Sequence, residues 1–255
     1  MQGRPLATAL VLSLLFAGCM QGVPGRGDSS SRGNPFVVPG EDILVQFDVV
    51  SGREPSVFAR DALVSVMERV GTNVSTSVRS NLAEKDGYSV EDMWALHETF
   101  YPADRHTWRN DEGQAVLHVL YLAGEWLDDP GGTTVGLSFV GLWPLIVLFY
   151  DRLPTTSLWF SQVEVPGLSK DGFERSVLIH EYGHSLGLVG CGLPMTKVRH
   201  DDADPCHSTE KASVMLAYVH SNEDPALWLR GDDMQPLWQF DEHDWADIRA
   251  YQDNL

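Results

Sequence analysis

The sequence predicts an α/β (α+β) fold, and three observations support this class. The 255 residues include 43% hydrophobic and 21% charged residues, a composition typical of a globular protein, which excludes a disordered chain. Several short apolar runs are typical of buried strands, whereas other segments carry apolar residues at helical spacing. The two kinds of segment mix along the chain without an internal repeat, so helices and strands are expected to pack together.

Three segments are predicted to be strands. Residues 43–50 (ILVQFDVV) form a short run of mainly β-branched and aromatic residues, which favour strands. Residues 115–123 (AVLHVLYLA) and 144–150 (PLIVLFY) are almost continuously apolar, as is typical of strands that are covered on both faces of a sheet.

Helices are predicted from the spacing of the apolar residues and from their boundary residues. Residues 55–70 have apolar side chains on one helical face, Pro55 or Ser56 near the start and Gly71 at the end, as expected for helix termini. Similar patterns predict helices over 89–101, 171–188 and 241–252.

Residues 1–18 are predicted to be a targeting signal rather than part of the fold. Arg4 is their only charge, and the apolar stretch over 6–18 rises about 20 Å as a helix, too short for the roughly 30 Å core of a bilayer. The stretch ends in LFAGC, and small residues before a cysteine resemble the lipobox of bacterial lipoproteins. This resemblance implies a cell-envelope lipoprotein with lipid on Cys19; the alternative is an ordinary secretory signal, and export is expected in both cases.

Residues 19–40 are rich in glycine, serine and proline, and we predict that they form a flexible, lipid-anchored linker to a domain over 41–255. The chain has 36 acidic and 18 basic residues and a formal net charge of −18. This charge argues against nucleic acid and anionic lipid surfaces as partners. We therefore expect a monomer that meets the membrane only through its N-terminal lipid.

Residues 180–184 (HEYGH) are the strongest functional signal. On the predicted helix, His180 and His184 are four residues apart and lie on one face, where both imidazoles can bind one zinc ion at about 2.0–2.1 Å. Glu181 borders such an ion without being needed as a ligand, so it can accept a proton from a zinc-bound water. This is the H-E-x-x-H arrangement of zinc metalloproteases, whose catalytic zinc needs a third protein ligand.

The sequence around these residues resembles the metzincins, whose pattern is H-E-x-x-H-x-x-G-x-x-H followed by a methionine turn. Gly187 matches this pattern, but Gly190 stands where the third histidine belongs. Downstream, residues 207–215 (HSTEKASVM) are similar to the matrixin segment that runs from the third zinc histidine to the turn methionine. The resemblance therefore implies His207 as the third ligand and Met215 as the methionine beneath the metal, with an insertion before His207.

The resemblance also implies a fold: a mixed, twisted sheet with an active-site helix, the methionine turn and a C-terminal helix. In metzincins the substrate lies extended along an edge strand above the zinc. Either the segment around 133–138 or residues 144–150 could supply that strand.

Cys191 and Cys206 bracket the insertion, and a disulfide between them would bring His207 back to the end of the helix. Other third ligands remain open at this point: His200, or a carboxylate such as Asp201 or Asp202. The acidic residues 201–204 (DDAD) could instead bind Ca²⁺, although a solvated loop is the commoner case.

These residues imply a zinc-dependent endopeptidase that hydrolyses protein or peptide substrates through a zinc-bound water activated by Glu181. Two alternatives remain. One is a zinc-binding lipoprotein derived from a metalloprotease that cleaves nothing. The other is a zinc hydrolase of another fold, with a glutamate such as Glu210 or Glu223 as the third ligand.

Overall fold

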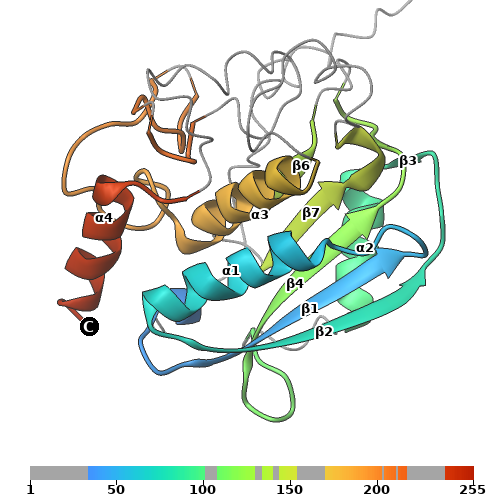
Figure 1. Cartoon of the computed structure of the whole chain (residues 1–255), viewed down its shortest axis with the longest axis horizontal. Coiled ribbons are helices and arrows are strands. Elements are labelled where there is room, and N and C mark those ends of the chain that lie inside the picture. Colours follow the sequence, from blue (N-terminus) through green and yellow to red (C-terminus); the bar gives the residue numbers. More distant parts are fainter. Residues whose placement is uncertain are drawn as a thin grey trace, which may run out of the picture.

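A five-stranded sheet with the strand order β2-β1-β4-β7-β6 forms the centre of the protein (Figure 1). Four strands are parallel, and β6 pairs antiparallel with β7 at one edge. The strands span Asp42–Val50 (β1), Asn73–Leu82 (β2), Ala115–Leu122 (β4), Gly136–Ser138 (β6) and Leu145–Phe149 (β7). A separate parallel pair consists of β3 (Gly87–Tyr88) and β5 (Glu125–Trp126). The predicted α/β class with a mixed sheet is confirmed.

The computed structural model describes residues 34–100, 108–129, 134–139, 144–153, 170–202, 204–210, 212–216 and 239–255. Within these ranges, no helix has the length and apolar character needed to cross a membrane. The predicted signal over 1–18, the predicted lipidation site Cys19 and residues 20–33 of the predicted linker lie outside the described residues.

The three predicted strands correspond to β1, β4 and β7, whereas β2 and β6 were not predicted as strands from periodicity. β2 is an edge strand without a single fully buried residue, so its sequence NVSTSVRSNL has no apolar run. β6 has three residues, too few for a pattern. Both strands exist because they complete the hydrogen bonding of a buried neighbour, which is a tertiary effect.

All four predicted helices are present: α1 (Val57–Val70), α2 (Val90–Phe100), α3 (Lys170–Leu186) and α4 (Glu242–Gln252). The expected boundary residues of α1 are confirmed, since the Ser56 side chain accepts a hydrogen bond from the Ala59 amide and Gly71 has a φ of 106°. α4 begins with a capping box in which the side chains of Asp241 and Asp244 each accept a hydrogen bond from the other's backbone.

The two faces of the sheet are covered by different helices. α1 and α3 pack side by side on one face (Figure 1), where Leu117 and Tyr121 of β4 enter the main core. On the opposite face, Leu120 and Leu122 of the same strand pack with Met93 of α2. β4 is apolar along its whole length because both of its faces are buried.

The linker boundary was predicted too far along the chain, because residues 34–38 belong to the folded domain. Phe36 and Val37 are fully buried in a short 3-10 turn, Pro35–Val37. The Asn34 side chain donates to the carbonyl oxygens of Ser185 and Leu186 at 2.8 and 3.2 Å, where α3 ends. These two carbonyls have no partner within the helix, so this segment helps to hold the end of α3 in place.

Candidate metal centre

Three histidines from two distant segments meet beside α3. His180 and His184 lie one helical turn apart, and their Nε2 atoms are 2.9 Å from each other. His207 joins them, so that one nitrogen from each of the three residues lies within 4.8 Å of the others. The rings of His180 and His207 are stacked, and the ring of His184 is nearly perpendicular to both. All three side chains are buried, so their nitrogens converge on a site that is shielded from bulk water.

Neighbouring groups orient two of these imidazoles. His180 Nδ1 lies 2.7 Å from the carbonyl oxygen of Val214. A carbonyl can only accept, so Nδ1 carries the hydrogen and Nε2 keeps its lone pair. His207 Nδ1 lies 3.0 Å from Oδ1 of Asp204, so a carboxylate lies behind the third imidazole. A carboxylate or carbonyl behind a histidine is the usual outer partner of a metal-binding imidazole.

The donor set fits a zinc ion. Zinc binds imidazole nitrogen at about 2.0–2.1 Å with tetrahedral geometry, which places nitrogen ligands roughly 3.3 Å apart. The nitrogens of His180, His184 and His207 are close enough for this arrangement. In the described part of the chain, no other group of three histidine, cysteine or acidic side chains comes together in this way.

Glu181 places a carboxylate next to this donor set. Its side chain is fully buried, and neither oxygen has a hydrogen-bond partner among the described residues. Burial raises the pKa of Glu181 well above its ordinary value, because the charged form loses its hydration. A buried carboxylate without a partner is unfavourable for folding alone, and such groups are found where a site has to act on a ligand.

The edge strand β6 contacts α3 beside this carboxylate. A Cβ atom on Gly136 would lie 2.5 Å from Val177 Cγ1 and 2.7 Å from Glu181 Oε1, so any larger residue there would displace these side chains. β6 lies at the edge of the sheet, within the first of the two segments proposed for the edge strand. The second proposal is wrong, since residues 144–150 contain β7, which is paired on both sides by β4 and β6.

Replacement of Gly136 by alanine is therefore expected to impair catalysis without removing the metal donors. The added methyl group pushes against Glu181 Oε1 and Val177, and a displacement of about 1 Å in a catalytic group can lower the rate by about 100-fold. We expect kcat to fall at least tenfold at unchanged zinc content. An unchanged kcat for Gly136→Ala would contradict the close contact.

Met215 packs against α3 at the glycine between the two histidines of the helix. It is fully buried, and a Cβ atom on Gly183 would overlap its sulfur. Its carbonyl accepts a hydrogen bond from the Ser208 amide at 2.8 Å, which links the turn at 213–216 to the residue after His207. Met215 thus lies against the helix segment that carries His180 and His184, with a packing role and no part in the donor set.

The chain turns sharply where α3 ends and the insertion begins, and the end of the insertion lies close to this turn. Gly187 has a φ of 87°, and a Cβ atom on it would lie 2.9 Å from the Cα atom of Gly192, so the chain closes on itself at this point. Cys191 and Cys206 form the predicted disulfide, with their Cα atoms 5.3 Å apart. Cys191 lies just after the end of α3, and His207 follows Cys206 directly. The disulfide therefore holds His207 close to the end of this helix.

Removal of this disulfide is expected to destabilise the domain. The bond closes a loop with a sequence separation of 15, which corresponds to about 3 kcal/mol in the chain-entropy model. The double variant Cys191→Ser/Cys206→Ser should lose about this much free energy of unfolding in denaturant titrations. Two alkylatable thiols in the unreduced wild-type domain would show that the bond is absent.

The alternative third ligands lie outside the histidine group. His200 Nε2 is 3.0 Å from Oδ1 of Asp202, whose side chain is almost fully exposed, and Asp201 is likewise not part of the group. Glu210 pairs with Lys197 at 2.6 Å. Glu223 lies outside the described residues. In the sequence, Asp204 appeared only as part of an acidic stretch, but its carboxylate lies behind the ring of His207. The one sequence signal for this contact is that Asp204 stands three residues before His207.

A second pair of buried histidines lies on the opposite face of the sheet. His97 Nδ1 is 3.1 Å from His118 Nδ1, and His118 Nε2 is 3.2 Å from Asp48, which Arg79 binds through two hydrogen bonds. Burial lowers the pKa of His97 to about 3 and also lowers that of His118, because the charged form of each ring loses its hydration. The side chains of His97, His118, Asp48 and Arg79 thus contact one another in a chain. A metal site needs donor atoms that converge on one point.

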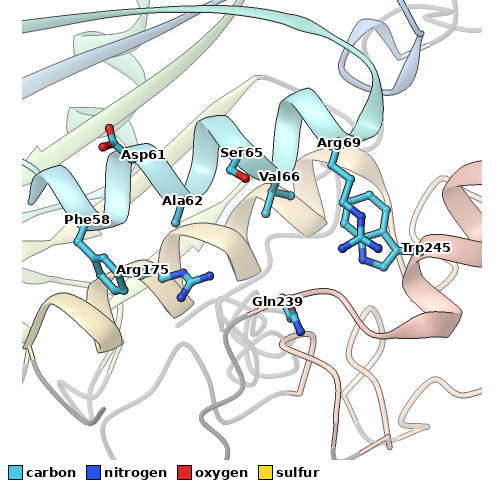
Figure 2. A pocket seen from close by; sticks show the side chains of 9 residues that line it. All are labelled: Phe58, Asp61, Ala62, Ser65, Val66, Arg69, Arg175, Gln239 and Trp245. Carbon is cyan, nitrogen blue, oxygen red and sulfur yellow. The ribbon is translucent and has the colours of Figure 1, made fainter.

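A surface groove of about 300 Å³ lies between α1, α3 and α4, away from the three histidines (Figure 2). In the groove, the Arg69 guanidinium stacks on the Trp245 ring with 4.0 Å to the ring centroid, and Arg175 lies near Phe58. No member of the histidine group lines it, and Arg175 is five residues before His180, about 140° around the helix. The groove is therefore separate from the candidate metal centre.

Comparisons with known proteins leave the family open. No known family profile and no curated protein matches the chain. Among the solved structures that match is a zinc-dependent peptidase from Methanocorpusculum labreanum (strain Z), with 12% sequence identity and a TM-score of 0.47. The match covers 80% of this chain and 99% of that one. A similarity of this size does not establish a family or an activity, so the functional argument rests on the residues themselves.

Proposed function

We propose that this protein is a zinc-dependent endopeptidase of metzincin type. The observation that carries the proposal is the convergence of three buried imidazoles, from His180, His184 and His207, beside the unpartnered carboxylate of Glu181. Structural zinc sites use four protein ligands, whereas catalytic sites use three and leave a position for water or substrate. The H-E-x-x-H motif and the resemblance of residues 207–215 to the matrixins support the same conclusion.

Each residue has a separate task in this proposal. His180 and His207 would bind zinc through Nε2, because the Nδ1 atoms face the Val214 carbonyl and the Asp204 carboxylate. When bound, zinc supplies a Lewis acid that polarises the scissile carbonyl and makes the attacking water more acidic. Glu181 would take up the proton that the water loses and deliver it to the leaving amine nitrogen.

The substrate would be an extended peptide that adds to the edge of the sheet at β6. Among the described residues, this strand pairs with β7 on one side only, and Gly136 brings its backbone next to Glu181. An edge strand offers unpaired backbone groups to an extended chain, which is a recurrent mode of peptide recognition. Recognition of this kind needs no free peptide terminus, which favours an endopeptidase.

We further propose that the protein is exported and held at a bacterial cell envelope by a lipid on Cys19. The Cys191–Cys206 disulfide supports export, because such bonds persist mainly in oxidising compartments. Mass analysis of the mature N-terminus would reveal either a lipid on Cys19 or an unmodified secreted chain.

Zinc content and peptide cleavage, measured together, test the proposed activity. We expect one zinc per chain, cleavage of casein or a quenched internal peptide, loss of cleavage with a chelator, and recovery when zinc is added. Zinc binding without any cleavage would favour the non-catalytic lipoprotein instead. Cleavage that persists after complete metal removal would disprove the mechanism.

A further inference from the structure

The insertion carries an arginine that is completely buried against the C-terminal helix. The Arg199 guanidinium lies 2.8 Å from Oδ1 of Asp244 and 2.7 Å from Oδ2 of Asp247, and all three side chains have no exposed surface. Both the backbone amide and the hydroxyl of Thr196 donate to Oδ1 of Asp247, at 2.6 and 2.7 Å. The insertion is thus bonded to α4 through a three-membered ion cluster.

Such a cluster is a poor source of stability in itself. The transfer of a guanidinium and two carboxylates out of water is unfavourable, and apolar side chains of similar size often hold a fold together equally well. What charged groups add is direction, because Nη2 of Arg199 lies within 2.8 Å of both carboxylates and so ties their positions to each other.

One connection leads from Arg199 to the third histidine. The Arg199 carbonyl accepts hydrogen bonds from the amide and the hydroxyl of Thr209, at 2.8 and 3.1 Å. The Asp201 amide donates to the carbonyl of His207 at 2.8 Å. Between these bonds, residues 200 and 208 form an antiparallel bridge. The backbone that carries Arg199 is therefore the direct hydrogen-bonding partner of the backbone that carries His207.

A second connection leads from the cluster to the first histidine. Oδ2 of Asp244 accepts a hydrogen bond from the Ser213 hydroxyl at 2.8 Å, and the same hydroxyl oxygen accepts one from the Met215 amide at 2.9 Å. Between these two residues stands Val214, whose carbonyl faces His180 Nδ1 at 2.7 Å. The turn that orients His180 is therefore attached to the carboxylate that Arg199 binds.

We propose that Arg199, together with Asp244 and Asp247, is a positioning unit for the metal centre. The cluster positions His207 through the strand-like pairing of the insertion, and it positions His180 through the turn at 213–215. The inference rests on the proposed zinc site and extends it, because it gives the insertion a task in metal binding.

The test compares two variants that each remove a guanidinium from a buried carboxylate. Arg199→Met removes the positioning arginine, and Arg79→Met is the matched control, since Arg79 makes two hydrogen bonds to the buried Asp48 on the opposite face of the sheet. Dissociation constants for Zn²⁺ and Co²⁺, and the Co²⁺ absorption spectrum, are measured at a temperature where circular dichroism shows each metal-free variant to be folded. Under this condition, a loss of overall stability does not change the measured affinity.

We expect Arg199→Met to bind zinc about 10-fold more weakly, at the lower end of the loss found for groups that contact a metal ligand directly, and to show an altered Co²⁺ spectrum. Arg79→Met should match the wild type. Arg199→Lys retains the charge but lacks the guanidinium, so it should lie between wild type and Arg199→Met, and it carries the test if Arg199→Met does not fold.

Wild-type affinity in folded Arg199→Met, or in Arg199→Lys where only that variant folds, would overturn the inference. Equal weakening in Arg79→Met would also overturn it, because the effect would then be unspecific. A wild-type domain that binds neither Zn²⁺ nor Co²⁺ would instead overturn the proposed zinc site and, with it, the need for a positioning unit. Peptide cleavage is not required for any of these measurements.

Discussion

Glu181→Gln is expected to abolish peptide hydrolysis while zinc stays bound. The amide has nearly the same shape as the carboxylate but cannot take up the proton of the attacking water, and general bases contribute about 10²- to 10⁴-fold to catalysis. Because Glu181 is not among the three proposed zinc ligands, the zinc content should remain at the wild-type value. The measurement is kcat together with metal analysis on the same preparation.

Glu174→Gln is the matched control for this variant. Glu174 is a second buried glutamate on α3, and its Oε1 accepts hydrogen bonds from the Ser56 amide at 3.0 Å and the Tyr121 hydroxyl at 2.9 Å. Its replacement should lower stability and leave kcat per folded molecule unchanged. If Glu181→Gln retained full turnover, the assignment of Glu181 as the base would be wrong.

His207→Ala is expected to weaken zinc binding strongly, whereas His200→Ala should leave it unchanged. Structural zinc sites with four ligands bind with about 10–16 kcal/mol, or roughly 3 kcal/mol for each ligand. The loss of one ligand should therefore weaken binding by about 100-fold or more. His200 faces Asp202 and stands outside the histidine group, so its imidazole should not contribute.

Zinc titration of both variants, with folding checked by circular dichroism, separates the two histidines. Wild-type affinity in His207→Ala would show that the third donor has been misassigned. A strong loss in His200→Ala alone would move the third ligand into the insertion. The pair of variants thus tests the histidine geometry independently of any peptide substrate.

The elements that could be predicted from the sequence are those with a strong local pattern. β4 and β7 are buried on both faces, so they are uniformly apolar, and α1 has both its capping serine and its terminal glycine. β2 was missed because an exposed edge strand carries no such pattern, and its pairing with β1 is a contact between distant segments. The domain start was placed too late because Phe36 and Val37 are buried only by packing against the rest of the fold.

Local spacing was sufficient to place His180, Glu181 and His184 on one helix, because residues four apart on a helix share a face whatever surrounds them. Packing decided everything that links distant segments: the arrival of His207, the position of Asp204 behind it, and the buried contact between the insertion and α4. Those contacts form only when the loop between Cys191 and Cys206 closes and the side chains around it are buried. Both conditions depend on residues far away in the sequence, so the local pattern around a residue does not reveal them.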